Sequence, residues 1–185
     1  MEAKILRLNK LGLPVAWISK QEAATLYAKS QIIWSLGNTT TVMLGGLNKN
    51  GERSKIDVAS IIACHGVNDH NHYVPPLTNA LLFRRDMCRC MYCGEVFSEK
   101  ELTRDHIVPR VQQGPDIWSN VVAACKRCNN VKGGRTPEQA GMELLAVPFV
   151  PNVFEFMYLS NRIILGDQME YLEKKFSSKR CWLAA

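Results

Sequence analysis

The sequence predicts an α+β protein in three parts, and three observations lead to this fold class. Short β-like runs surround one helical segment in the first 75 residues. Two Cys-x-x-Cys pairs frame the middle of the chain, and apolar residues recur at helical spacing after residue 148. We therefore divide the chain into a small N-terminal α+β unit (1–75), a central unit framed by the cysteines (76–147) and a C-terminal helical extension (148–185).

The composition is that of a folded protein with a basic balance. Apolar residues make up 46% and charged residues 22% of the 185 residues, both ordinary for a globular chain. The net charge of +6 suits a polyanionic partner such as nucleic acid, although many proteins without such a partner share it. No apolar run reaches the roughly 18 residues of a membrane span, and the start of the chain does not resemble a signal peptide. Because thiols stay reduced in the cytoplasm, the cysteine content favours a cytoplasmic protein.

The N-terminal unit is predicted from alternation and helix signals. Ser19 followed by Glu22 forms a capping box for a helix over residues 22–30. The β-like runs cover residues 4–8, 14–18, 31–36, 39–44 and 56–63. Nothing in this unit resembles a catalytic site.

A polar connector follows, and it allows a second interpretation. Cys64, His65, His70 and His72 lie within nine residues and could bind a metal ion. Their spacing matches no zinc pattern, and the segment is rich in Asn, Asp, Gly and Pro. We prefer the interpretation as a connector.

Helices are predicted on both sides of the cysteine frame. Residues 78–85 form a short helix that delivers Arg84 and Arg85 to the central unit. Thr136, followed by Pro and by Gln139, is a strong helix start. One long helix is expected from Pro151 to about Phe176, because apolar residues recur there at steps of three, four or seven.

Two pairs of cysteines with the same spacing predict a structural zinc site. Four thiolates, from Cys90, Cys93, Cys125 and Cys128, satisfy a tetrahedral zinc ion, and a closed four-Cys site is structural. Cys88 could compete with Cys90, and buried thiols without metal are the alternative to the whole site.

The 31 residues between the pairs contain the dipeptide Asp105-His106. A carboxylate is a hard ligand for Mg²⁺ or Mn²⁺, and an imidazole titrates near neutral pH and can take a proton from water. Phosphodiester hydrolysis requires these two functions. Adjacent strand residues point to opposite faces, so the two share one site only if the strand ends or bends there, as Pro109 suggests.

Together these motifs resemble an HNH endonuclease of the ββα-metal type over about residues 84–145. The resemblance is carried by Arg85-Asp86, Cys90-x-x-Cys93-Gly94, Asp105-His106-x-x-Pro109, Gly114, Trp118-x-Asn120 and Cys125-x-x-Cys128-Asn129-x-x-Lys132. It implies that His106 is the general base, that Asp105 and Asn129 hold one catalytic divalent ion, and that Asn120 ties the loop between the strands and helps to orient His106. Asn129 stands where the family name has its last His, and its oxygen favours Mg²⁺ or Mn²⁺. Asn130 could take its place.

Basic side chains gather around the frame. Residues 81–135 hold ten Lys and Arg against six acids, a net charge of +4. The candidate phosphate contacts are Arg104, Arg110, Lys126, Arg127, Lys132 and Arg135. For each of them, ordinary solvated charge is an equal alternative. Trp118 is expected in the core rather than stacked on a base.

The sequence thus predicts a metal-dependent endonuclease with structural Zn²⁺ and catalytic Mg²⁺ or Mn²⁺, acting on DNA, with double-stranded DNA preferred. One site cuts one strand, so nicking is expected, and a double-strand cut needs a homodimer or a second event. The rival interpretation is a catalytically silent, zinc-dependent nucleic-acid-binding module. The N-terminal unit could in addition bind a partner protein.

Overall fold

The computed structural model describes residues 2–47, 49–65 and 74–177. The chain forms two compact units, and the predicted α+β class is confirmed. The first unit combines the described parts of residues 1–73 and 152–178, and the second unit is residues 74–151. No helix in the described ranges has both the length and the apolar character that a bilayer crossing demands. The predicted connector with His70 and His72, and the end of the chain from residue 178, lie outside the described residues.

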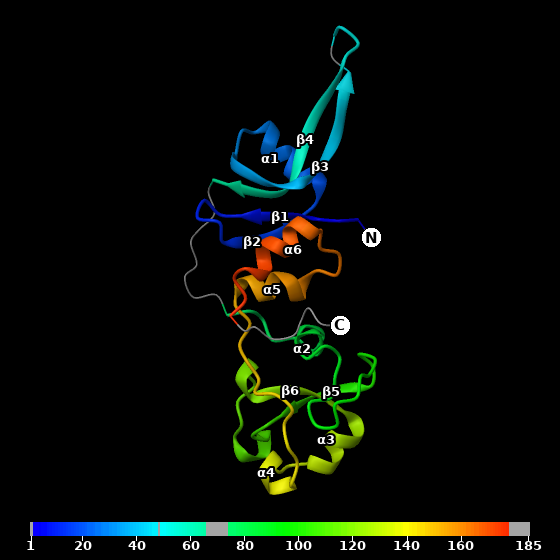
Figure 1. Ribbon diagram of the computed structural model, residues 1–185, viewed down its shortest axis with the longest axis vertical. Coiled ribbons are helices and arrows are strands. Elements are labelled where there is room, and N and C mark those ends of the chain that lie inside the picture. Colours follow the sequence, from blue (N-terminus) through cyan, green and yellow to red (C-terminus); the bar gives the residue numbers. More distant parts are fainter. Residues whose placement is uncertain (1, 48, 66–73, 178–185) are drawn as a thin grey trace. The chain divides into compact units, whose positions relative to one another are not determined.

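A four-stranded sheet forms the centre of the first unit. Its order is β2 (Pro14–Ile18), β1 (Ile5–Leu8), β4 (Arg53–Cys64) and β3 (Ile32–Leu47), with β1 parallel to β4 and the other pairs antiparallel (Figure 1). The two runs predicted over residues 31–44 belong to the single strand β3. Gly37 lies at φ +111°, and the register shifts between Leu36 and Thr40, so this point is an irregularity inside one strand and not its end.

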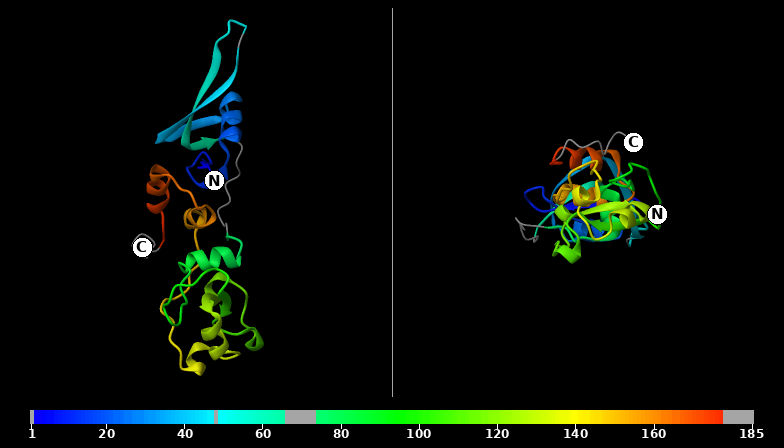
Figure 2. Two further views of the ribbon diagram at one scale, coloured as in Figure 1. Left: turned by 90° about the vertical axis from the view of Figure 1, so that its right-hand side faces the viewer. Right: turned by 90° about the horizontal axis from the view of Figure 1, so that it is seen from below.

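Helices cover both faces of this sheet (Figure 2). Ile5 and Ile62 pack with the helix α1 (Lys20–Ala28), which begins at the predicted Ser19–Glu22 capping box. Their neighbours Leu6 and Ile61 face the other way and form a core with α5 (Val153–Ser160) and α6 (Gly166–Glu173).

The C-terminal segment differs from its prediction in two respects. The expected long helix is two helices, because the backbone is extended at Asn161 and α6 has its own start, where the Gln168 side chain accepts from the N–H of Leu165. The sequence predicts residues 148–185 as a separate extension, whereas residues 152–177 complete the core of the first unit. Both faces of the sheet are apolar and α1 covers one of them. The other face is therefore left for α5 and α6.

The second unit is built on the hairpin of β5 (Leu102–His106) and β6 (Val121–Cys125), followed by α3 (Lys126–Lys132) and α4 (Pro137–Ala140) (Figure 1). Two short 3₁₀ turns, Arg110–Gln112 and Trp118–Asn120, lie in the loop between the strands. All five residues of β6 are buried, and Trp118 is 2% exposed, so its predicted place in the core is confirmed.

Arg85, at the end of α2 (Asn79–Arg85), fastens this helix to the hairpin. Its buried guanidinium pairs with Asp86 and donates to the backbone carbonyls of Trp118 and Val121. The Asp86 carboxylate accepts from the N–H of Ala123. This arginine therefore positions β6 from inside the core.

Candidate functional site

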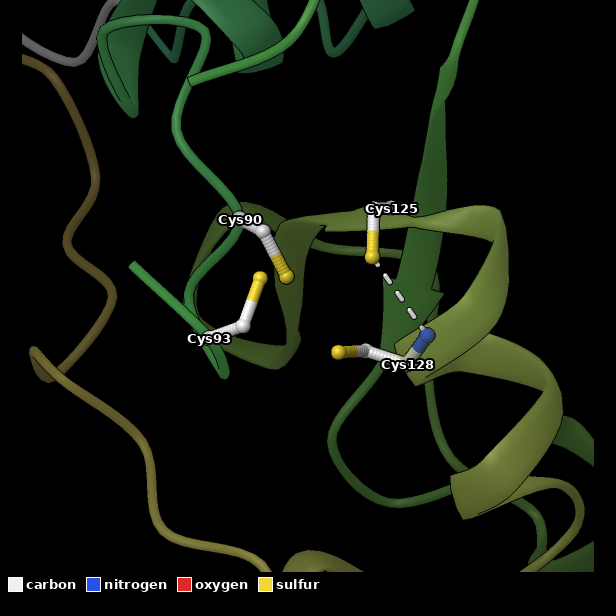
Figure 3. Close-up of side chains that lie close together, drawn as sticks. All are labelled: Cys90, Cys93, Cys125 and Cys128. Atoms are coloured by element: carbon white, nitrogen blue, oxygen red, sulfur yellow. Dashed lines mark hydrogen bonds between the residues drawn. The ribbon is translucent and has the colours of Figure 1, made fainter. Parts of the chain in front are cut away.

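The four predicted cysteines come together in the second unit (Figure 3). Cys90 and Cys93 lie in a turn, Cys125 ends β6, and Cys128 lies in the first turn of α3. Their sulfur atoms all lie within 4.8 Å of one another. In a tetrahedral zinc site with Zn–S distances of about 2.3 Å, the sulfur atoms lie about 3.8 Å from one another. The four residues therefore fit a zinc ion, and Cys88 is not part of the cluster.

The electrostatics of the cluster also favour a cation. Burial, followed by hydrogen bonds and charge from the neighbouring thiols, raises the pKa of Cys128. Burial acts in the same direction on Cys90, but backbone N–H donors outweigh it and lower its pKa. The Cys90 thiol therefore ionises more readily than the Cys128 thiol. A bound dication would deprotonate every thiol that coordinates it.

Asp105 is held by two side chains from different elements. Its side chain is 5% exposed, and Oδ1 accepts from Lys132 Nζ at 2.9 Å. The Tyr92 hydroxyl donates to Oδ2 at 2.5 Å. Burial, and then the hydrogen bond and charge of Asp105, raise the pKa of Tyr92, so the phenol stays protonated and remains a donor. Lys132 and Tyr92 therefore hold the carboxylate from the α3 side and from the cysteine turn.

Asn129 lies against the same strand. Its Nδ2 donates to Thr103 Oγ1 at 2.8 Å, and Thr103 and Asp105 share one face of β5 because they are two residues apart. The amide oxygen of Asn129 and the second lone pairs of the Asp105 oxygens remain as acceptors. Oxygen ligands of these two kinds suit Mg²⁺ or Mn²⁺, which take few protein ligands and add water and phosphate oxygens.

His106 is the last residue of β5, and the chain bends directly after it at Ile107 and Val108. β5 therefore ends at the dipeptide, which is the condition under which Asp105 and His106 can share one site. The imidazole does not share the partners of Asp105: its Nε2 lies 2.9 Å from Asp116 Oδ1. Arg104 binds the same carboxylate through Nη1 at 2.8 and 3.0 Å. Partial burial acts to raise the pKa of Asp116, but Arg104 and His106 hold it below its usual value.

Asn120 ties the loop that follows His106, as the resemblance implies. Its Oδ1 accepts from the N–H of Val108, and its Nδ2 donates to the carbonyls of Val108 and Pro115. Gly114 is needed at this point, since an added Cβ would lie 1.7 Å from the Val108 carbonyl oxygen. The backbone N–H of Ile107 also donates to the Asn120 carbonyl. The loop is therefore fixed immediately beyond the imidazole.

The six candidate phosphate contacts fall into two groups, four with exposed side chains and two with side chains that are buried or largely buried. The exposed members are Arg110, Lys126, Arg127 and Arg135. Lys132 differs from its expected place, because its side chain is fully buried in the ion pair with Asp105. Arg104 is largely buried and binds Asp116, Asn79 and a backbone carbonyl. These two cations therefore organise the site from within.

The hairpin, the helix and the cysteine cluster define a ββα unit with a four-Cys cluster that could hold a metal ion. Residues 90–145 match the model of the HNH endonuclease family, which confirms the resemblance predicted from the motifs. A segment of 51 residues is 45% identical to the CRISPR-associated endonuclease Cas9 of Corynebacterium diphtheriae. The match covers 27% of this chain and 5% of that relative, so the chain corresponds to a small part of it.

The Lys132–Asp105 pair gives a stability prediction. Lys132→Met should lower the unfolding free energy of the second unit by about 3–5 kcal/mol, because it leaves a buried carboxylate without its cation. Urea denaturation, followed by a spectroscopic signal that reports on the second unit, measures the change in unfolding free energy. The exposed Lys126→Met is the matched control, expected within about 0.5 kcal/mol of wild type. Adding Asp105→Leu to Lys132→Met should recover part of the loss; no recovery would mean that the buried charge is not its cause.

Proposed function

We propose that the protein is a metal-dependent endonuclease that hydrolyses phosphodiester bonds in DNA. The observation that carries the proposal is the end of β5 in the HNH-like segment. There a buried carboxylate and an imidazole follow one another, and Asn129 lies against the same strand on the carboxylate side. The chain covers 5% of its Cas9 relative, so the proposal rests on these residues and not on that protein's activity.

The residues of the chain have separate tasks in this reaction. His106 takes the proton of the attacking water, and Asp105 and Asn129 would hold the divalent ion. When bound, this ion neutralises charge on the phosphate and the leaving oxygen. Lys132 and Tyr92 keep the Asp105 carboxylate in one orientation, so little reorganisation is needed when the substrate arrives. Asn120 holds the loop beyond His106.

DNA is the proposed substrate because exposed cations lie on the same unit as the site. Arg110, Lys126, Arg127 and Arg135 can contact phosphates, and such contacts fix the position of the duplex without reading its sequence. One site of this kind cuts one strand, so we propose nicking, with a homodimer or a second event required for a double-strand cut. A cytoplasmic location stays a prediction from the free thiols.

The test is a plasmid-nicking assay on the full chain. We expect conversion of supercoiled to open-circular plasmid with Mg²⁺ or Mn²⁺, loss of it after brief treatment with EDTA, and recovery when either ion is added back. The zinc content is measured in each sample, so that loss of the structural ion is not mistaken for loss of the catalytic one. Plasmid binding without nicking, at full zinc content and with either ion, would instead establish the catalytically silent nucleic-acid-binding module.

A further inference from the structure

The partner of the His106 imidazole is a side chain that the sequence motifs leave unassigned. Asp116 lies ten residues downstream, in the loop between β5 and β6, and its Oδ1 is 2.9 Å from Nε2 of the imidazole. The imidazole is 19% exposed, so this carboxylate acts on a largely enclosed ring. A carboxylate that accepts a hydrogen bond from one ring nitrogen of a histidine commonly fixes both the orientation of the ring and its tautomer.

Asp116 is itself held in place. Arg104 Nη1 donates to both of its carboxylate oxygens, at 3.0 and 2.8 Å. The guanidinium is anchored in turn by Asn79 Oδ1 at 2.9 Å and by the carbonyl of Leu77 at 3.3 Å. Arg104 and His106 are two residues apart on β5 and therefore share a face, which explains how both reach one carboxylate. The carboxylate is thus a fixed acceptor and not a mobile surface acid.

We propose that Asp116 is a positioning residue that holds His106 in its Nε2–H tautomer. An ionised carboxylate can accept but not donate a hydrogen bond, so the Nε2 that faces it carries the proton. The lone pair of the neutral ring is then on Nδ1, and Nδ1 is the atom that takes the proton from water. Asp116 stays ionised throughout and stabilises the imidazolium that forms. This assignment rests on the proposed function for its catalytic meaning, but the tautomer is a property of the protein alone.

The tautomer is measured by ¹⁵N NMR of histidine-labelled protein over a pH series, and it is read where the ring carries one proton. The His106 signals are identified by their absence in His106→Gln. We expect a protonated Nε2 and an unprotonated Nδ1 in the wild type, and a mixture of tautomers in Asp116→Ala. An Nδ1–H tautomer in the wild type, or a pattern unchanged in Asp116→Ala, would overturn the inference, whether or not the protein cuts DNA.

The kinetic test separates positioning from folding. Asp116→Asn should lower kcat for nicking by about 10²–10⁴-fold, the range of general-base catalysis, with KM within about twofold. Asp116→Glu should restore part of kcat, and Asp57→Asn, an exposed aspartate on β4, is the matched control. A wild-type kcat in Asp116→Asn contradicts the inference. Absence of nicking by the wild type contradicts the proposed function instead, and the NMR result then still decides the role of Asp116.

Discussion

Cys125→Ala should unfold the second unit and release its zinc. A structural zinc ion contributes about 10–16 kcal/mol to the folding of small zinc domains, which is as large as the whole stability of most domains. Cys125 ends the fully buried strand β6 and also accepts a hydrogen bond from the N–H of Cys128 at the start of α3. Its loss therefore removes a ligand at the junction of the strand and the helix that carry the site.

Hydrogen exchange of the β6 amides and the zinc content of the full chain measure this effect. We expect one zinc ion per wild-type chain, and in the variant loss of the ion together with loss of protection in β6. Cys88→Ala is the matched control, because Cys88 is next to the frame but outside the cluster of sulfur atoms. It should keep its zinc. Full protection of β6 in a zinc-free Cys125→Ala protein would show that the hairpin folds without a metal ion.

The cysteine cluster could be predicted because its signal is local in the sequence. Two residues between the members of each pair let both sulfurs face one ion, and the pairs needed only to be brought together by the hairpin. β5 ends at His106, close to the bend that Pro109 suggests, and the loop contacts of Asn120 agree with what the family resemblance implies. These features depend on residues whose chemistry is recognisable by type and spacing.

The remaining parts of the site depend on contacts that spacing does not encode. A lysine near a basic cluster suggests phosphate binding, yet Lys132 is fully buried, because α3 directs it toward Asp105 on β5. Tyr92 stood inside a Cys-x-x-Cys pair, and nothing marked it as a partner of that carboxylate. Asp116 is one of six acids in residues 81–135, and no motif distinguishes it from the others. The placement of α5 and α6 likewise required knowledge that the sheet is apolar on both faces.

His106→Ala should reduce the rate of nicking by about 10²–10⁴-fold while leaving the fold and the binding of DNA intact. The base is lost, but the cations that contact phosphate and the residues around Asp105 remain. The imidazole makes one side-chain hydrogen bond, to the half-exposed Asp116, so its removal should change stability by about 1 kcal/mol or less. Steady-state nicking, thermal unfolding and fluorescence anisotropy with labelled duplex measure the three quantities.

The comparison with His65→Ala makes this result specific. His65 is exposed beyond the end of β4 in the first unit and should be replaceable without loss of nicking. Equal rates for His106→Ala and the wild type, with Mg²⁺ or Mn²⁺ present, would falsify the assignment of the base. A variant that loses nicking and also loses zinc or DNA binding would place His106 in the architecture of the hairpin instead. Intact binding with a lost rate is the outcome that the position of His106 predicts, since it is the last residue of β5 and the Lys132–Asp105 pair contacts its backbone carbonyl and not its imidazole.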